Sequence, residues 1–212
     1  MFGKLRIVLW GLVLVAAVAL AFLLTRPEPK LPAPKTTELP LSSIGGPFTL
    51  VGTDGQPFAS TKLAGKPFAI FFGFTHCPDV CPTTLARLTK LRRQLGKGDD
   101  AFAIVFVSVD PERDGPAEVG AYAGLFDTPV IGLTGTPAQI EQVKKQYAVF
   151  SAKAPQPGGD YSVDHTASVF VMDRAGKFVA TIAPEESDAV ALDKLKRVSN
   201  GSAQAPAFDE QQ

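Results

Sequence analysis

The chain has 212 residues, 45% of them hydrophobic, and its 21 basic residues balance 21 acidic residues. This length and composition support one well-packed domain with additional segments, and the balanced charge argues against a nucleic-acid partner. Two cysteines are too few for a disulfide framework, so we expect the core to supply the stability.

The N-terminal residues 1–25 predict a transmembrane helix that anchors the protein in a membrane. Ile7 to Leu24 contains 18 residues without a charge, close to the minimum length that spans a bilayer. The alternative is a cleavable signal peptide with a cleavage site near Ala19-Leu20-Ala21. We favour the anchor because the apolar run continues beyond that site. The basic residues before it place the rest of the chain on the extracytoplasmic side, in the periplasm of a bacterium, under either interpretation.

Residues 26–47 predict a linker, because six prolines in this stretch favour extended polyproline II and disfavour helix. At about 3.1 Å per residue, Arg26 to Pro40 could reach roughly 45 Å. Such a linker would hold a domain near the membrane and let it visit a membrane-bound partner.

Strand and helix patterns alternate from Phe48 onward, which predicts an α/β fold. The expected elements are a hairpin over 48–58, strands over 68–74, 102–109, 130–133, 168–172 and 178–182, and helices over 82–95, 116–126, 138–147 and 185–198. We expect a loop at Ala154–Gly159. Two strand–helix–strand crossovers followed by a hairpin and a helix predict a thioredoxin-like domain over 48–199, with a central mixed sheet flanked by helices. Residues 200–212 are predicted to form a flexible tail.

Cys77 and Cys81, the two cysteines of the chain, follow the buried strand pattern at the point where a helix begins. Pro82 suits the first helical position, which makes Cys81 the expected N-cap. Both sulfurs would then lie near the positive end of the helix dipole, which favours thiolate over thiol. A thiolate can bind a metal ion or exchange disulfides, so this placement leaves both uses open.

Three features favour a metal over disulfide exchange. Three residues separate the cysteines, whereas dithiol oxidoreductases of this fold use two. The segment Val163–Ala167, expected to face the thiols, lacks the cis-proline of those enzymes. It carries His165 instead, and an imidazole beside two thiolates suits Cu(I).

The chain resembles the Sco/SenC family of copper-binding, thioredoxin-like cytochrome c oxidase assembly proteins. The matching motifs are Gly73-Phe-Thr-His-Cys-Pro-Asp-Val-Cys-Pro82, Ser108-Val-Asp-Pro-Glu-Arg-Asp114 and Val163-Asp-His-Thr166. The resemblance covers about Leu41 to Val198. It implies that Cys77, Cys81 and His165 are copper ligands, and that the protein acts in assembling the dinuclear copper centre of the oxidase.

The first hypothesis is a membrane-anchored copper chaperone that passes copper to an oxidase subunit. The second is an anchored thiol-disulfide reductase that keeps the cysteines of that subunit reduced, with Cys77 and Cys81 as its catalytic, redox-active pair. Other copper chaperones or thiol reductants are further candidate partners. A peroxidase-like enzyme or redox sensor ranks below both, because no motif ties Thr75 and Arg87 to that chemistry.

Several polar residues near the motifs have two interpretations. His76 is expected to be a bystander that could influence a thiol pKa. Asp79 and Asp164 are candidates for orienting ligands or contacting a partner, and each could equally be a turn residue. Asp110 to Asp114 follows a strand end where sheets of this kind bind ligands. Asp110 followed by a proline is equally typical of a helix start.

Overall fold

The computed structural model of the protein describes Trp10, Phe22 and residues 44–202. Apart from those two residues, the predicted anchor over 1–25 lies outside the described residues, as do most of the predicted linker and tail. None of the helices in the described part of the chain has the length and apolar character needed to cross a bilayer.

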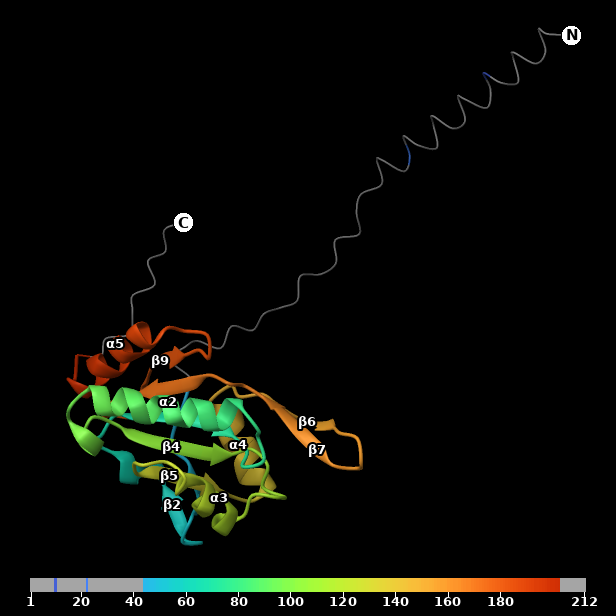
Figure 1. Cartoon of the computed structure of the whole chain (residues 1–212), viewed down its shortest axis with the longest axis horizontal. Helices are drawn as coiled ribbons and strands as arrows, with labels where there is room; N and C mark the ends of the chain where they lie inside the picture. The colour runs from blue at the N-terminus through green and yellow to red at the C-terminus, as the bar shows by residue number, and fades with distance from the viewer. Residues whose placement is uncertain (1–9, 11–21, 23–43, 203–212) are drawn as a thin grey trace, which may run out of the picture. The chain divides into compact units, whose positions relative to one another are not determined.

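A seven-stranded mixed sheet forms the centre of the domain, as predicted (Figure 1). Strands β3, β4 and β5 run parallel, and all other pairings in the sheet are antiparallel. The strand order is β2-β1-β5-β4-β3-β8-β9. The strands are β1 (Thr49–Gly52), β2 (Pro57–Ala59), β3 (Phe68–Gly73), β4 (Ala103–Ser108), β5 (Val130–Thr134), β8 (Val169–Met172) and β9 (Phe178–Ile182).

Helices cover both faces of this sheet, which is why every residue of the central strands β3 and β4 is buried. Side chains alternate along β3, so Phe71 and Phe72 point to opposite faces. The Phe71 ring packs near Phe106, which contacts Tyr122 of α3, whereas Phe72 packs against Tyr147 just after α4. The helices are α2 (Val80–Gln94), α3 (Pro116–Ala123), α4 (Pro137–Gln146) and α5 (Asp188–Ser199), and two short 3-10 helices span Ser60–Leu63 and Gly98–Asp100.

The segment predicted as a loop at Ala154–Gly159 is instead part of a β-hairpin, which corrects the sequence expectation. Strands β6 (Ser151–Pro155) and β7 (Tyr161–His165) pair with each other and project from the body (Figure 1). The Gln156 N–H donates to the Asp160 carbonyl and closes the turn. Gly158 and Gly159 both adopt positive φ, 91° and 87°, which suits glycine there. The Pro/Gly composition thus marks the turn alone, and the strands extend to either side of it.

Helix α2 begins earlier than predicted, and the expected N-cap at Cys81 is wrong. The N-cap is Asp79, whose carbonyl accepts the Thr83 N–H, so Cys81 lies in the first turn. Pro82 fits there because the first N–H groups of a helix have no intrahelical partner.

The predicted linker also ends sooner than residue 47. The Gly45 N–H donates to the Gln146 carbonyl, and the Gln146 side chain donates to the Pro47 carbonyl. Ile44 packs against the core. Residues 44–47 therefore belong to the folded domain.

Candidate metal centre

The candidate site lies where β3 ends, at the carboxyl edge of the parallel strands, which is where open α/β sheets bind ligands. After Gly73 the chain turns, with the Cys77 N–H donating to the Phe74 carbonyl, and then enters α2. Cys77 lies in that turn and Cys81 in the first turn of the helix. The third residue, His165, is the last residue of β7 (Tyr161–His165).

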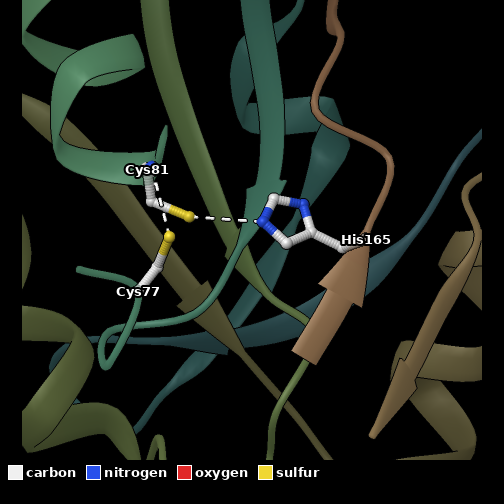
Figure 2. Close-up of side chains that lie close together, drawn as sticks. All are labelled: Cys77, Cys81 and His165. Carbon is white, nitrogen blue, oxygen red and sulfur yellow. Dashed lines mark hydrogen bonds between the residues drawn. The ribbon is translucent and has the colours of Figure 1, made fainter. Parts of the chain in front are cut away.

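The structure brings together all three residues that the sequence singled out (Figure 2). Their ligand atoms, two sulfurs and one ring nitrogen, all lie within 4.8 Å of one another. His165 Nε2 is 3.4 Å from Cys81 Sγ, and the Cys81 N–H lies 3.4 Å from Cys77 Sγ. Both cysteines are free thiols.

The imidazole of His165 is held with Nε2 facing the sulfurs. Its Nδ1 lies 3.0 Å from the Thr166 carbonyl oxygen. A carbonyl can only accept, so Nδ1 carries the proton and Nε2 offers a lone pair. The rings of Phe71 and Phe74 pack edge-on against the imidazole, with centroids 5.9 and 5.8 Å away. Burial lowers the pKa of His165, which keeps the ring neutral and able to bind a metal.

The two thiols differ in exposure. Cys81 is fully buried, whereas Cys77 is half-buried. Burial raises the pKa of the Cys81 thiol far above its ordinary value, with Cys77 and Asp114 adding to the effect. The expectation that the helix dipole makes Cys81 a thiolate is therefore wrong for the metal-free protein. A protonated Cys81 can donate to His165 Nε2, 3.4 Å away, and a bound metal ion would replace that proton.

Gly73 makes room for the buried sulfur. A Cβ atom at this position would lie 2.7 Å from Cys81 Sγ and 3.1 Å from the Phe106 ring. A side chain here would displace the sulfur, because real Cβ atoms do not approach other atoms so closely. The glycine at the end of β3 thus sets how near α2 can bring Cys81 to the sheet.

Asp114 holds the turn that carries Cys77, a role that the sequence did not reveal. Its carboxylate is completely buried and accepts the Thr75 N–H at 2.8 Å, the Thr75 hydroxyl at 2.6 Å and the Ser108 hydroxyl at 2.6 Å. His76 Nδ1 lies 3.5 Å from the same carboxylate. The pairing of Asp114 with Thr75 spans 39 residues, so no local pattern could indicate it.

The remaining polar candidates take different places. Asp79 caps α2 and accepts the Thr83 hydroxyl at 3.2 Å. Asp164 is exposed on β7 and favours the protonated form of His165 only weakly compared with burial. Asp110 is buried and starts a turn rather than a helix, since its carbonyl accepts the N–H groups of Arg113 and Asp114.

The donor set suits a soft metal ion. Thiolate and imidazole bonds of about 2.0–2.3 Å place three donors about 3.5–4 Å apart around one ion, close to the spacing here. Two sulfurs with one neutral imidazole match the preference of Cu(I). Of the three candidate ligands, Cys81 is buried, whereas Cys77 and His165 are half-buried.

The model of the protein family described as SCO1/SenC matches residues 36–200 of the chain. The solved structure of Bradyrhizobium japonicum ScoI with copper bound is 45% identical in sequence and gives a TM-score of 0.67, covering 73% of this chain and 99% of that chain. A structure that identifies a disulfide switch in BsSco, a member of the Sco family of cytochrome c oxidase assembly proteins, is 26% identical with a TM-score of 0.59. The match covers 76% of this chain and 96% of that chain.

Among curated proteins, the mitochondrial protein SCO2 of Saccharomyces cerevisiae is 36% identical over 157 residues. The match covers 73% of this chain and 52% of the yeast protein, so the chain spans about half the length of that relative.

Proposed function

Because the chain belongs to the SCO1/SenC family, we propose that it is a membrane-anchored copper chaperone that delivers copper to the dinuclear copper site of cytochrome c oxidase during assembly. The observation that carries this proposal is the convergence of Cys77, Cys81 and His165, with ligand atoms within 4.8 Å of one another. The copper-bound relative and the oxidase-assembly relative support it.

Copper is the cargo, bound by two thiolates and a neutral imidazole. Binding displaces the proton of Cys81, so loading is coupled to proton release. Transfer begins at Cys77, since its sulfur is the more exposed of the two. A thiolate of the recipient subunit takes the place of Cys77 on the ion, and further exchange releases Cys81 and His165.

The proposed location follows from the N-terminal segment. The uncharged run from Ile7 to Leu24 would anchor the chain, and the basic residues before it would leave the copper-binding domain on the extracytoplasmic side. The proline-rich residues 26–43 would then act as a tether. The recipient is a copper-receiving oxidase subunit, and other copper chaperones or thiol reductants would supply the metal or the electrons.

A second function, reduction of the recipient's disulfide, is favoured by one observation: two free thiols lie close together and one of them is half-buried. Cys77 would attack the disulfide as a thiolate and form a mixed disulfide, releasing one thiolate of the partner. Cys81, losing its proton, would then displace the second. Two electrons pass to the recipient, which leaves Cys77 and Cys81 joined.

One experiment separates these functions. The full chain in detergent is mixed with the copper-site domain of an oxidase subunit, which is either reduced and metal-free or oxidised. A chaperone loaded with copper transfers the metal to the reduced domain, measured as the copper content of that domain after the two proteins are separated, and Cys77→Ser abolishes the transfer. If the loaded protein transfers no copper but its metal-free form stoichiometrically reduces the oxidised domain, the chaperone proposal is wrong and the reductase is right.

A further inference from the structure

The hairpin that carries His165 has no backbone pairing with the main sheet. In the described part of the chain, β6 and β7 form a separate two-stranded sheet (Figure 1). His165 pairs with Ser151 at the base of the hairpin. Both cysteines, in contrast, are fixed by β3 and α2. Side-chain contacts between the hairpin and the rest of the domain therefore help to set where the imidazole lies relative to the sulfurs.

Arg113 supplies several of these contacts. Its Nη1 donates to the Tyr161 carbonyl at 2.9 Å and to Asp160 Oδ1 at 3.0 Å, both at the start of β7. Its guanidinium lies over the Tyr161 ring, 3.7 Å from the centroid. The side chain is only 18% exposed, so these charge-assisted contacts are partly shielded from water.

Asp110 completes the connection. Its carboxylate accepts Arg113 Nε at 2.6 Å and the Tyr161 hydroxyl at 2.8 Å. The carboxylate is 1% exposed, and a buried charge of this kind is costly unless it is paired. Arg113 belongs to the same segment as Asp110, whereas the Tyr161 hydroxyl reaches the carboxylate only while the hairpin stays docked. We call Asp110, Arg113 and Tyr161 the hairpin clamp.

One five-residue segment, Asp110 to Asp114, contacts both the hairpin that carries His165 and the turn that carries Cys77. Asp110 and Arg113 form hydrogen bonds with the hairpin, and Asp114 accepts hydrogen bonds from Thr75 in the turn before Cys77. The segment from Asp110 to Asp114 thus sets the position of one ligand-bearing element relative to the other.

We propose that the hairpin clamp positions His165 against the two sulfurs and thereby sets how tightly the protein holds its metal. The inference rests on the proposed function for the identity of the metal, Cu(I). Its physical basis is preorganisation. Because the hairpin is already fixed when the chain folds, metal binding does not have to supply the entropy cost of ordering it. Without the clamp, the imidazole leaves the sulfurs more often and copper dissociates faster.

The test compares Arg113→Gln with Arg87→Gln in the full chain. Arg87 is a matched control, since its side chain is also 18% exposed and bonds to Asp188 and to backbone carbonyls, but it joins α2 to the region of α5. Arg113→Gln is expected to weaken Cu(I) binding by about 10- to 100-fold, and Arg87→Gln by less than about threefold. Tyr161→Phe, which removes only the hydroxyl bond to Asp110, should produce a smaller loss.

A double-mutant cycle shows whether the clamp acts through the imidazole. In a His165→Ala background, Arg113→Gln should weaken copper binding no further, because its effect depends on that ligand. An equal loss in both backgrounds, or wild-type affinity in Arg113→Gln, overturns the inference.

Amide hydrogen exchange of the metal-free protein tests the clamp without copper. The Thr166 N–H donates to the Phe150 carbonyl at the base of the hairpin. Arg113→Gln should speed exchange of this amide and of β7, and leave α4 unchanged. If Arg113→Gln speeds exchange but the wild-type protein binds no copper, the clamp is supported and the proposed function is wrong. Unchanged exchange rejects the clamp.

Discussion

Cys81 Sγ and His165 Nε2 lie 3.4 Å apart, although 84 residues separate them in the sequence. The contact of Nδ1 with the Thr166 carbonyl and the raised pKa of the Cys81 thiol favour a thiol that donates to Nε2 in the metal-free protein. A metal ion that replaces this proton gains two ligands that are already aligned. Cys81 and His165 are thus organised for binding before any metal arrives.

Replacing Gly73 by alanine should damage the site and the fold together. The new methyl group would meet Cys81 Sγ at 2.7 Å, and overpacking of this kind costs about 1–3 kcal/mol. Chemical denaturation measures the free energy of unfolding, and a Cu(I) titration measures the affinity. Gly124→Ala is the control, since its added atom would meet only backbone oxygens at ordinary distances. Equal behaviour of the two variants would contradict the close approach at Gly73.

Replacing Asp114 by alanine should lower the free energy of unfolding by about 2–4 kcal/mol, because the buried Ser108 hydroxyl and two half-buried donors of Thr75 lose their acceptor. Asp114→Asn should cost less, since the amide keeps one acceptor oxygen. Asp193→Ala removes an exposed ion pair and should change stability by less than about 1 kcal/mol. Urea denaturation of the three variants checks this order. If Asp114→Ala has the same free energy of unfolding as the wild type, other contacts hold the turn before Cys77.

Alkylation should distinguish the two thiols of the metal-free, reduced protein. Cys77 is half-buried, whereas burial raises the pKa of Cys81, so Cys81 stays protonated and shielded at neutral pH. Peptide mass spectrometry after brief iodoacetamide treatment should find Cys77 modified first. Cys81 should react only in strongly alkaline solution or after unfolding, and Cys77→Ser should leave a slowly reacting protein. Equal labelling rates at pH 7 would refute the buried, protonated Cys81.

The half-buried imidazole of His165 should make the metal-free protein less stable in acid. Burial lowers the pKa of His165 below that of an unfolded histidine, about 6.5. As the pH falls below that value, the unfolded chain binds a proton that the folded protein resists, so the free energy of unfolding decreases. Denaturation at pH 7.5 and 5.5 should show a larger decrease for the wild type than for His165→Gln. Identical decreases would mean that His165 is not the group responsible.

Local patterns were enough to predict the main sheet, the helices that cover it and the three candidate ligands. Continuous apolar runs mark β3 and β4, and helical spacing marks α2. The β6–β7 hairpin was missed because its strands are short and partly exposed, and its turn residues dominate the composition. Asp114 and the hairpin clamp were missed for another reason: their bonds to Thr75 and Tyr161 join distant segments, and only the folded chain brings them together.

The most direct test of the account is a competition titration of Cu(I) between the full chain and a chromophoric chelator. We expect one copper ion per wild-type chain, with His165→Ala binding at least about tenfold more weakly while its far-ultraviolet circular dichroism is unchanged. A His165→Ala protein that binds Cu(I) as tightly as the wild type would contradict the three-ligand site, and with it the metal-carrier function proposed for this chain.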